Sequence, residues 1–305
     1  MTQPSPTAHR VARVELNAPP VNSLGITLRQ HIVESIRAAE ADPQVAAIVL
    51  IGTDKAFSAG ADVAERSPFL MLDYAAPTRF EPTTQRRGVG QHPHRGFETV
   101  TIVYAGEVEH RDSTGKGGVI GAGDVQWMTA GSGILHQEMP KGDFDGRMHG
   151  FQLWANLPSS LKMTAPRYQD VKGKDIPEIM DDDGTVVKVI VGSFWGKTGP
   201  VDGIAADPQY LDIYVPPNRR KSFKIDTYRR AFAYIFDGKG TFRDASRPRG
   251  VLLEKEVMGQ EVNIRDMSGD RTLIQFGTGD EVTVQAGPDG IRFLLISGAP
   301  IQEPV

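Results

Sequence analysis

Three histidines and one glutamate form the pattern in this chain that is best suited to chemistry. His92 and His94 make an H-x-H pair, and His136 and Glu138 make an H-x-E pair further along. In a β-strand, residues two apart point to the same face, so two such pairs on neighbouring strands would aim four ligands at one point. Three imidazole nitrogens and one carboxylate oxygen suit iron, copper, nickel, manganese or zinc, and the residue types do not choose among them. The pattern predicts a metal site.

The composition narrows the kind of site and the class of protein. The chain has no cysteine, which excludes disulfides and thiolate ligands. A structural zinc site is closed and usually Cys-rich, so a catalytic or sensing metal with open coordination positions is favoured. The net charge of -4 gives no electrostatic reason to expect direct binding to nucleic acid or to an anionic membrane. There is no apolar run long enough to span a membrane and no secretory leader, so we expect a cytoplasmic protein without membrane contact.

The elements that must position the four residues are predicted to be short β-strands. Most of the chain alternates apolar and polar residues and is interrupted by glycine, which is typical of a sandwich or small barrel. A length of 305 residues favours two domains. Strands are expected at 100–113, 117–127, 148–156, 186–192, 210–215, 232–240, 271–277 and 292–298. The polar, turn-rich stretch 166–184 is interpreted as the linker between two β domains.

An internal repeat supports this division. The run from Val103 to Asp112 is similar to the run from Ile235 to Asp244. When the two copies are laid over each other without gaps, the positions of the four candidate ligands are occupied in the second copy by Lys224, Asp226, Arg292 and Leu294. All seven histidines lie at or before position 149. The second copy is therefore predicted to hold no metal.

Residues 1–66 have a different character. A strand at 11–16, a helix at about 28–41 and a buried strand at 45–52 predict a βαβ unit. Leu16-Asn-Ala-Pro-Pro-Val-Asn22 and Ala56-Phe-Ser-Ala-Gly-Ala-Asp62 resemble the opening of the crotonase (enoyl-CoA hydratase/isomerase) family. That resemblance implies an oxyanion-hole N–H at Ala61. No stretch matches the second oxyanion-hole segment or the catalytic carboxylates of that family, so we interpret this segment as an appended fragment without acyl-CoA chemistry.

From about residue 67 onward, the chain closely resembles the pirin family. The resemblance is carried by His92-Pro-His-Arg-Gly-Phe-Glu-Thr99, Gly123-Asp-Val-Gln-Trp-Met-Thr-Ala-Gly131, Gly133-Ile-Leu-His-Gln-Glu-Met-Pro140 and Gln152-Leu-Trp-Ala-Asn156. It implies two cupin domains (jelly-roll β-barrels) and a mononuclear iron(II) site, with other divalent transition metals as alternatives. The implied ligands are His92, His94, His136 and Glu138.

The resemblance implies two alternative functions. Some family members cleave quercetin-type flavonols with dioxygen and release carbon monoxide, and Glu138 would then be the catalytic base for the flavonol 3-hydroxyl. Others are redox-sensitive regulators that bind transcription factors or metabolic enzymes. The fold prediction is a mainly β protein with a short α/β fragment at 1–66, a metal-binding cupin at 67–165, a linker at 166–184 and a metal-free cupin at 185–305.

Other residues near the pattern receive secondary roles. Glu98 is expected to support the site or the fold rather than to bind metal. Phe97, Trp127 and Met128 are expected in the core, with a flavonol pocket as the alternative. His110 is expected at the surface or in a salt bridge, and His149 in the core.

Overall fold

The computed structural model describes residues 10–15, 26–42, 44–51, 67–80, 88–242, 249–250 and 268–303. The chain divides into two compact units, Met1–Glu65 and Arg66–Val305. The N-terminal unit contains strand β1 (Arg10–Glu15), helix α1 (Ile26–Glu40) and strand β2 (Val45–Ile51), and β1 pairs with β2 in parallel. The predicted βαβ unit is confirmed. Ala61 and its loop lie outside the described residues.

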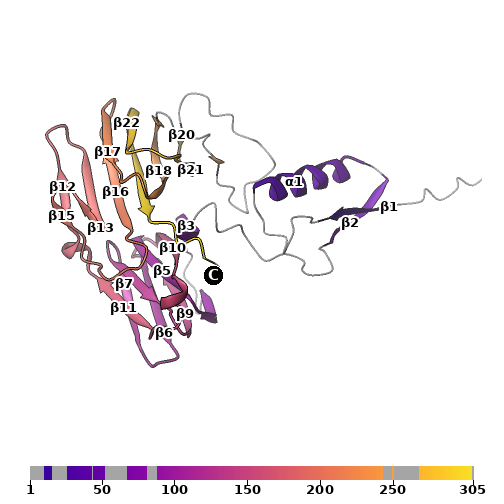
Figure 1. Cartoon of the computed structure of the whole chain (residues 1–305), viewed down its shortest axis with the longest axis horizontal. Helices are drawn as coiled ribbons and strands as arrows, with labels where there is room; N and C mark the ends of the chain where they lie inside the picture. The colour runs from indigo at the N-terminus through magenta and orange to yellow at the C-terminus, as the bar shows by residue number, and fades with distance from the viewer. Residues whose placement is uncertain are drawn as a thin grey trace, which may run out of the picture. The chain divides into compact units, whose positions relative to one another are not determined.

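The second unit is built almost entirely of strands, as the sequence predicted (Figure 1). Its first domain contains a five-stranded sheet in the order β11-β8-β5-β10-β3 and a four-stranded sheet in the order β4-β9-β6-β7. The five-stranded sheet consists of β3 (Phe69–Arg79), β5 (Phe97–Ala105), β8 (Val125–Thr129), β10 (Arg147–Asn156) and β11 (Arg167–Val171). The four-stranded sheet consists of β4 (Val89–His94), β6 (Glu107–Asp112), β7 (Gly117–Gly121) and β9 (Ile134–Lys141).

The second domain is a nine-stranded sheet, with β14 and β15 forming a separate hairpin. Its path runs β12-β13-β16-β22-β18-β21-β19, while β17 pairs with β22 and β20 with β18. The bounds are β12 (Glu178–Met180), β13 (Val186–Val191), β14 (Ser193–Phe194), β15 (Lys197–Thr198), β16 (Gln209–Val215), β17 (Arg220–Lys224), β18 (Arg230–Phe242), β19 (Arg249–Gly250), β20 (Ser268–Gly269), β21 (Thr272–Gln275) and β22 (Glu281–Gly298).

The stretch expected as a linker takes part in both domains. β11 pairs antiparallel with β8 of the first domain, and β12 pairs with β13 of the second. Two short 3-10 helices, Ser159–Leu161 and Gly173–Asp175, flank β11. No helix among the described residues is long and apolar enough to cross a membrane.

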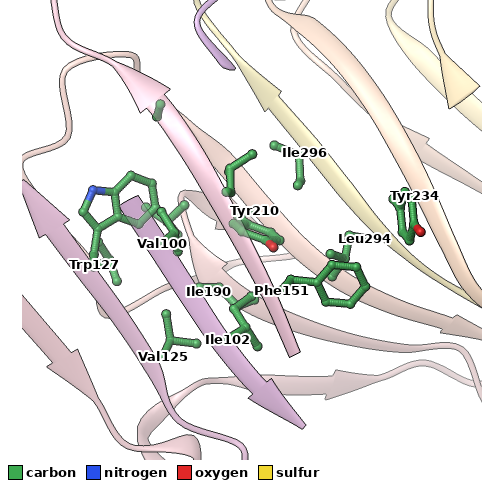
Figure 2. Packing of buried hydrophobic residues seen from close by; sticks show 14 of the residues in the cluster. Val100, Ile102, Val125, Trp127, Phe151, Ile190, Tyr210, Tyr234, Leu294 and Ile296 are labelled. Atoms are coloured by element: carbon green, nitrogen blue, oxygen red, sulfur yellow. The ribbon is translucent and has the colours of Figure 1, made fainter. Parts of the chain in front are cut away.

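One hydrophobic core is shared by the two domains. On β5, every second residue from Val100 points to this core, because side chains alternate between the faces of a strand. Val100, Ile102 and Trp127 of the first domain pack in one cluster with Tyr210 and Leu294 of the second (Figure 2). The opposite face of β5 lines the space between the two sheets of the first domain, where Val103 packs with residues of β6, β7 and β10.

Candidate metal centre

The two strands that carry the candidate ligands are neighbours, as the spacing predicted. β4 and β9 pair antiparallel, with His92 opposite His136 and His94 opposite Ile134. The register shifts between Val89 and His92, so one strand contains an irregularity beside the site. Such bulges redirect side chains and are common next to functional sites.

Gly88, directly before β4, allows this close pairing. Its φ of 137° is a conformation that residues with a side chain rarely adopt. A Cβ atom at this position would collide with the backbone of Glu138 and Met139. Glycine is therefore required where the chain enters the first ligand strand against the second.

The three imidazole rings converge on one point. His92 Nε2 lies 2.9 Å from His94 Nε2 and 3.0 Å from His136 Nε2. His94 and His136 are buried, and His92 is half-buried. Among the described residues, these three histidines are the one group of His, Asp and Glu side chains whose ligand atoms cluster tightly enough to hold a metal ion.

The protonation of the rings leaves lone pairs available to a cation. His92 Nδ1 lies 2.8 Å from the carbonyl oxygen of Gly90, which can only accept a hydrogen bond, so Nδ1 is the donor and Nε2 is the nitrogen left to bind a metal. Burial, assisted by the neighbouring histidines, lowers the pKa of His94 to about 4 and that of His136 to about 3. Near neutral pH these two rings are therefore neutral, the form that binds metal.

The observed spacing fits a transition-metal ion. Two nitrogens bound at about 2.1 Å to one ion and separated by about 90° lie about 3.0 Å apart, which matches both measured separations. The residues present fit a bound metal ion.

Glu138 lies beside this cluster. Its Oε2 is 3.8 Å from His136 Nε2, and its other oxygen, Oε1, accepts a hydrogen bond of 2.8 Å from Gln152 Nε2. Burial raises the pKa of Glu138 above its usual value, while the hydrogen bond from Gln152 opposes the rise. The carboxylate is outside the tight group formed by the three rings. Its role as fourth ligand stays a prediction.

An aromatic wall completes the surroundings. The Phe97 and Trp154 rings are stacked with centroids 4.6 Å apart, and both present edges or faces to His94 at 5.1 and 5.2 Å. Trp154 Nε1 donates to Gln152 Oε1 over 2.9 Å. Phe97 thus lies at the site, as one of the two sequence interpretations allowed. The sequence analysis assigned no role to Gln152 or Trp154. They are two residues apart on β10 and therefore share a face of the strand, which is the same signal that related His92 to His94.

Several other expected residues lie elsewhere. Glu98 is on the face of β5 that points to the shared core, and it accepts a hydrogen bond of 2.6 Å from Thr129 Oγ1. Trp127 is fully buried in the shared core and does not line the site. Met128 is also fully buried, in a small cluster with Ala130 and Ile134.

The surface position expected for His110 is wrong. The ring is only 3% exposed, because β6 is covered by β8 and β11 of the facing sheet. Its Nε2 lies 2.6 Å from Gln126 Nε2, which also donates to Asp170 Oδ1. His149 packs among Tyr74, Tyr104 and Phe151, in agreement with a core position.

These features define a class of protein. Two β-rich domains that share a core, with clustered histidines on paired strands of the first, define a two-domain cupin. The family model for Pirin matches residues 51–155, and that for the Pirin C-terminal cupin domain matches residues 210–305. The chain belongs to the pirin family. A model for Enoyl-CoA hydratase/isomerase matches residues 7–78, in agreement with the resemblance seen in that segment.

Individual relatives extend this finding. A Pseudomonas aeruginosa protein that is provisionally named a quercetin 2,3-dioxygenase is 40% identical over 78% of this chain and 77% of its own length. A pirin-like protein from Caulobacter vibrioides is 41% identical over 78% of each chain. The crystal structure of a quercetin 2,3-dioxygenase from Acinetobacter baumannii superposes with a TM-score of 0.67, at 37% identity, over 78% of this chain and 77% of that one.

Proposed function

We propose that this protein is a metal-dependent dioxygenase that cleaves quercetin-type flavonols, with iron(II) held by His92, His94, His136 and Glu138 in the first domain alone. The observation that carries the proposal is the convergence of three imidazole rings, with His92 Nε2 2.9 and 3.0 Å from the Nε2 atoms of His94 and His136. Two relatives that bear the name quercetin 2,3-dioxygenase support the choice of substrate and of dioxygen.

The reaction consumes one dioxygen and releases one carbon monoxide for each flavonol opened. An iron(II) ion bound at the centre supplies Lewis acidity and the one-electron chemistry that dioxygen requires. Glu138 would take the proton of the flavonol 3-hydroxyl onto Oε2, the oxygen that Gln152 does not hold, when the carboxylate swings partly off the metal. Its burial suits this step, because a carboxylate whose pKa is raised is a stronger base.

The aromatic wall favours a flat substrate. Trp154 is half-buried, and its ring centroid lies 5.2 Å from that of His94. Aromatic side chains at such sites provide flat apolar surface for a planar ligand. Phe97, stacked behind it, fixes the orientation of that surface.

The experiment that tests the proposal begins with anaerobic metal analysis of the purified protein. Quercetin and oxygen are then added, and carbon monoxide is measured. One iron per chain with release of carbon monoxide is the expected result. One iron per chain without turnover would contradict the dioxygenase assignment and favour the regulatory alternative, which is tested next by comparing partner binding in the ferrous and ferric states.

Variants at the proposed ligands test whether metal binding can be lost while the fold is kept. His92→Ala and Glu138→Ala are expected to lower metal content sharply while the β scaffold is kept, since both side chains lie at the cluster rather than in the shared core. His31→Ala, at an exposed position of α1, is the matched control and should leave metal content unchanged. Stoichiometric metal in both ligand variants would contradict the ligand assignment.

A further inference from the structure

Gln152 connects the carboxylate of the centre to the aromatic wall. Its side chain on β10 contacts Glu138 of β9 through one end of the amide and Trp154 through the other. The contact with Glu138 joins the five-stranded sheet to the four-stranded sheet beside the three histidines, whereas the contact with Trp154 lies within β10. Both hydrogen bonds have good lengths, 2.8 and 2.9 Å.

The orientation of the amide is determined by its neighbours. The indole N–H of Trp154 is a donor only, so it must meet the amide oxygen of Gln152. The amide nitrogen is then directed at Glu138 Oε1, where an acceptor is available. If the amide were flipped, it would place a donor against a donor at Trp154 and an acceptor against an ionised oxygen at Glu138.

The position of Trp154 is fixed in turn by its ring contacts. It stacks on Phe97 with an interplanar angle of 28° and meets the edge of His94 at 85°. A ring held on two sides gives its N–H a single direction. The order imposed on Trp154 is therefore transmitted through Gln152 to the carboxylate.

The consequence is that the two oxygens of Glu138 have different tasks. Oε1 is occupied by Gln152, whereas Oε2 is the oxygen nearest the imidazoles, 3.8 Å from His136 Nε2. A freely rotating carboxylate would present either oxygen, or both, to a bound ion. With Oε1 held, one oxygen is directed toward the centre.

We propose that Gln152, itself oriented by Trp154, is a positioning residue that presents a single oxygen of Glu138 to the metal centre. The proposal rests on the proposed metal centre but not on the identity of the substrate. Residues that orient a ligand through a hydrogen bond typically change metal affinity by about 10- to 100-fold when they are removed.

The test uses cobalt(II) as the probe, because its visible absorption reports the ligand arrangement. Gln152→Leu keeps the approximate size and removes both hydrogen bonds. Its Kd for cobalt(II) is expected to rise about 10- to 100-fold, with a changed cobalt spectrum. Trp154→Phe keeps a ring on Phe97 and removes only the N–H, so a smaller rise of about fivefold is expected.

Thr101→Val is the matched control. Thr101 Oγ1 accepts only a long contact of 3.4 Å from Gln152 Nε2, so its loss should leave both the Kd and the spectrum as in the native protein. Thermal unfolding of the metal-free proteins identifies any variant that has lost its fold. Trp154→Phe then carries the test if Gln152→Leu does not fold.

The outcomes separate this proposal from the dioxygenase assignment. A native Kd and spectrum in Gln152→Leu, or an equal loss in Thr101→Val, would overturn the positioning role. Native protein that takes up no cobalt(II) would overturn both the centre and the role. Weakened cobalt binding in Gln152→Leu, together with native protein that releases no carbon monoxide from quercetin, would overturn only the dioxygenase assignment.

Discussion

The interiors of the two β domains differ in chemistry although both domains are built of antiparallel strands. In the first domain, the space between the sheets holds the three clustered histidines, Glu138 and the buried His110. In the second, the corresponding interior is filled by apolar side chains such as Leu211, Phe223, Ile274, Phe293 and Leu295. One interior is arranged for ligation and the other for packing.

The difference between the two interiors concerns stability, because a site of buried polar groups lowers the free energy of unfolding and apolar packing raises it. Buried polar atoms without partners are unfavourable, and within the described part of the chain His110 Nδ1 and His136 Nδ1 have no hydrogen-bond partner. The second domain adds hydrophobic burial in its own interior and in the shared core, although Tyr210 Oη and Tyr234 Oη in that shared core also have no partner among the described residues. Four variants or conditions test this division.

The largest effect is expected in the interior of the second domain. Phe293 is fully buried, and its ring contacts those of Phe223 and Phe242 at 6.0 and 5.3 Å. Phe293→Ala should lower the free energy of unfolding by about 3–5 kcal/mol, measured by chemical denaturation, while metal bound per folded molecule stays constant. Phe144→Ala is the control, because Phe144 is 93% exposed. A small loss in Phe293→Ala would mean that this interior is not the main source of stability.

Metal addition should stabilise the protein through the first domain. At a free metal concentration about 100-fold above Kd, the free energy of unfolding should rise by about 2.7 kcal/mol. The rise should disappear in His94→Ala, which removes one of the clustered rings, and persist in Phe293→Ala. Thermal unfolding with and without metal measures it. Loss of the response in Phe293→Ala as well would show that the two interiors are not independent.

Glu98 is a buried carboxyl group outside the metal centre, so it tests how much polar burial alone costs in stability. Burial raises the pKa of Glu98 from its ordinary value of 4.5 to about 7. Between these values, the unfolded chain has released this proton and the folded chain has kept it, so the native protein loses stability as pH rises through the window. Glu98→Gln should therefore gain roughly 2 kcal/mol relative to the native protein between pH 5 and pH 8. Denaturation at both pH values measures this, and parallel curves would contradict it.

The smallest effect is expected at a hydrogen bond between the domains. Tyr104 Oη of the first domain donates to Asp212 Oδ2 of the second over 2.9 Å, and Arg292 binds the same carboxylate through two nitrogens. Tyr104→Phe should cost about 1 kcal/mol in denaturant unfolding. Tyr210→Phe is the matched control, since its buried hydroxyl has no partner among the described residues and its loss should be neutral. Equal losses would remove any special role of the Asp212 contact.

Local periodicity was sufficient to predict part of this architecture. Because side chains repeat every second residue in a strand, His92 and His94 were predicted to share a face, and the structure brings them together with His136. The βαβ unit followed from its helical period and its continuous apolar strand. The Pirin family resemblance was confirmed by the comparisons.

Features that depend on non-local pairing could not be predicted. The position of Glu98 depends on which face of β5 meets the second domain. The spacing of four residues between His94 and Glu98 does not indicate which face that is. The burial of His110 requires β11, whose sequence is polar and turn-rich, to pair with β8. The contact of Gln152 with Glu138 joins two sheets, which only the folded chain brings together.

The shared core has a consequence for anyone who would shorten or transplant this protein. A gene that encoded only the half with the three clustered histidines would expose Val100, Trp127 and Phe151 to water as one continuous apolar face. Proteins with such faces associate and aggregate. The second domain alone would likewise expose Tyr210 and Leu294. An engineer who wants the three histidines in another setting must carry both halves or redesign the face between them.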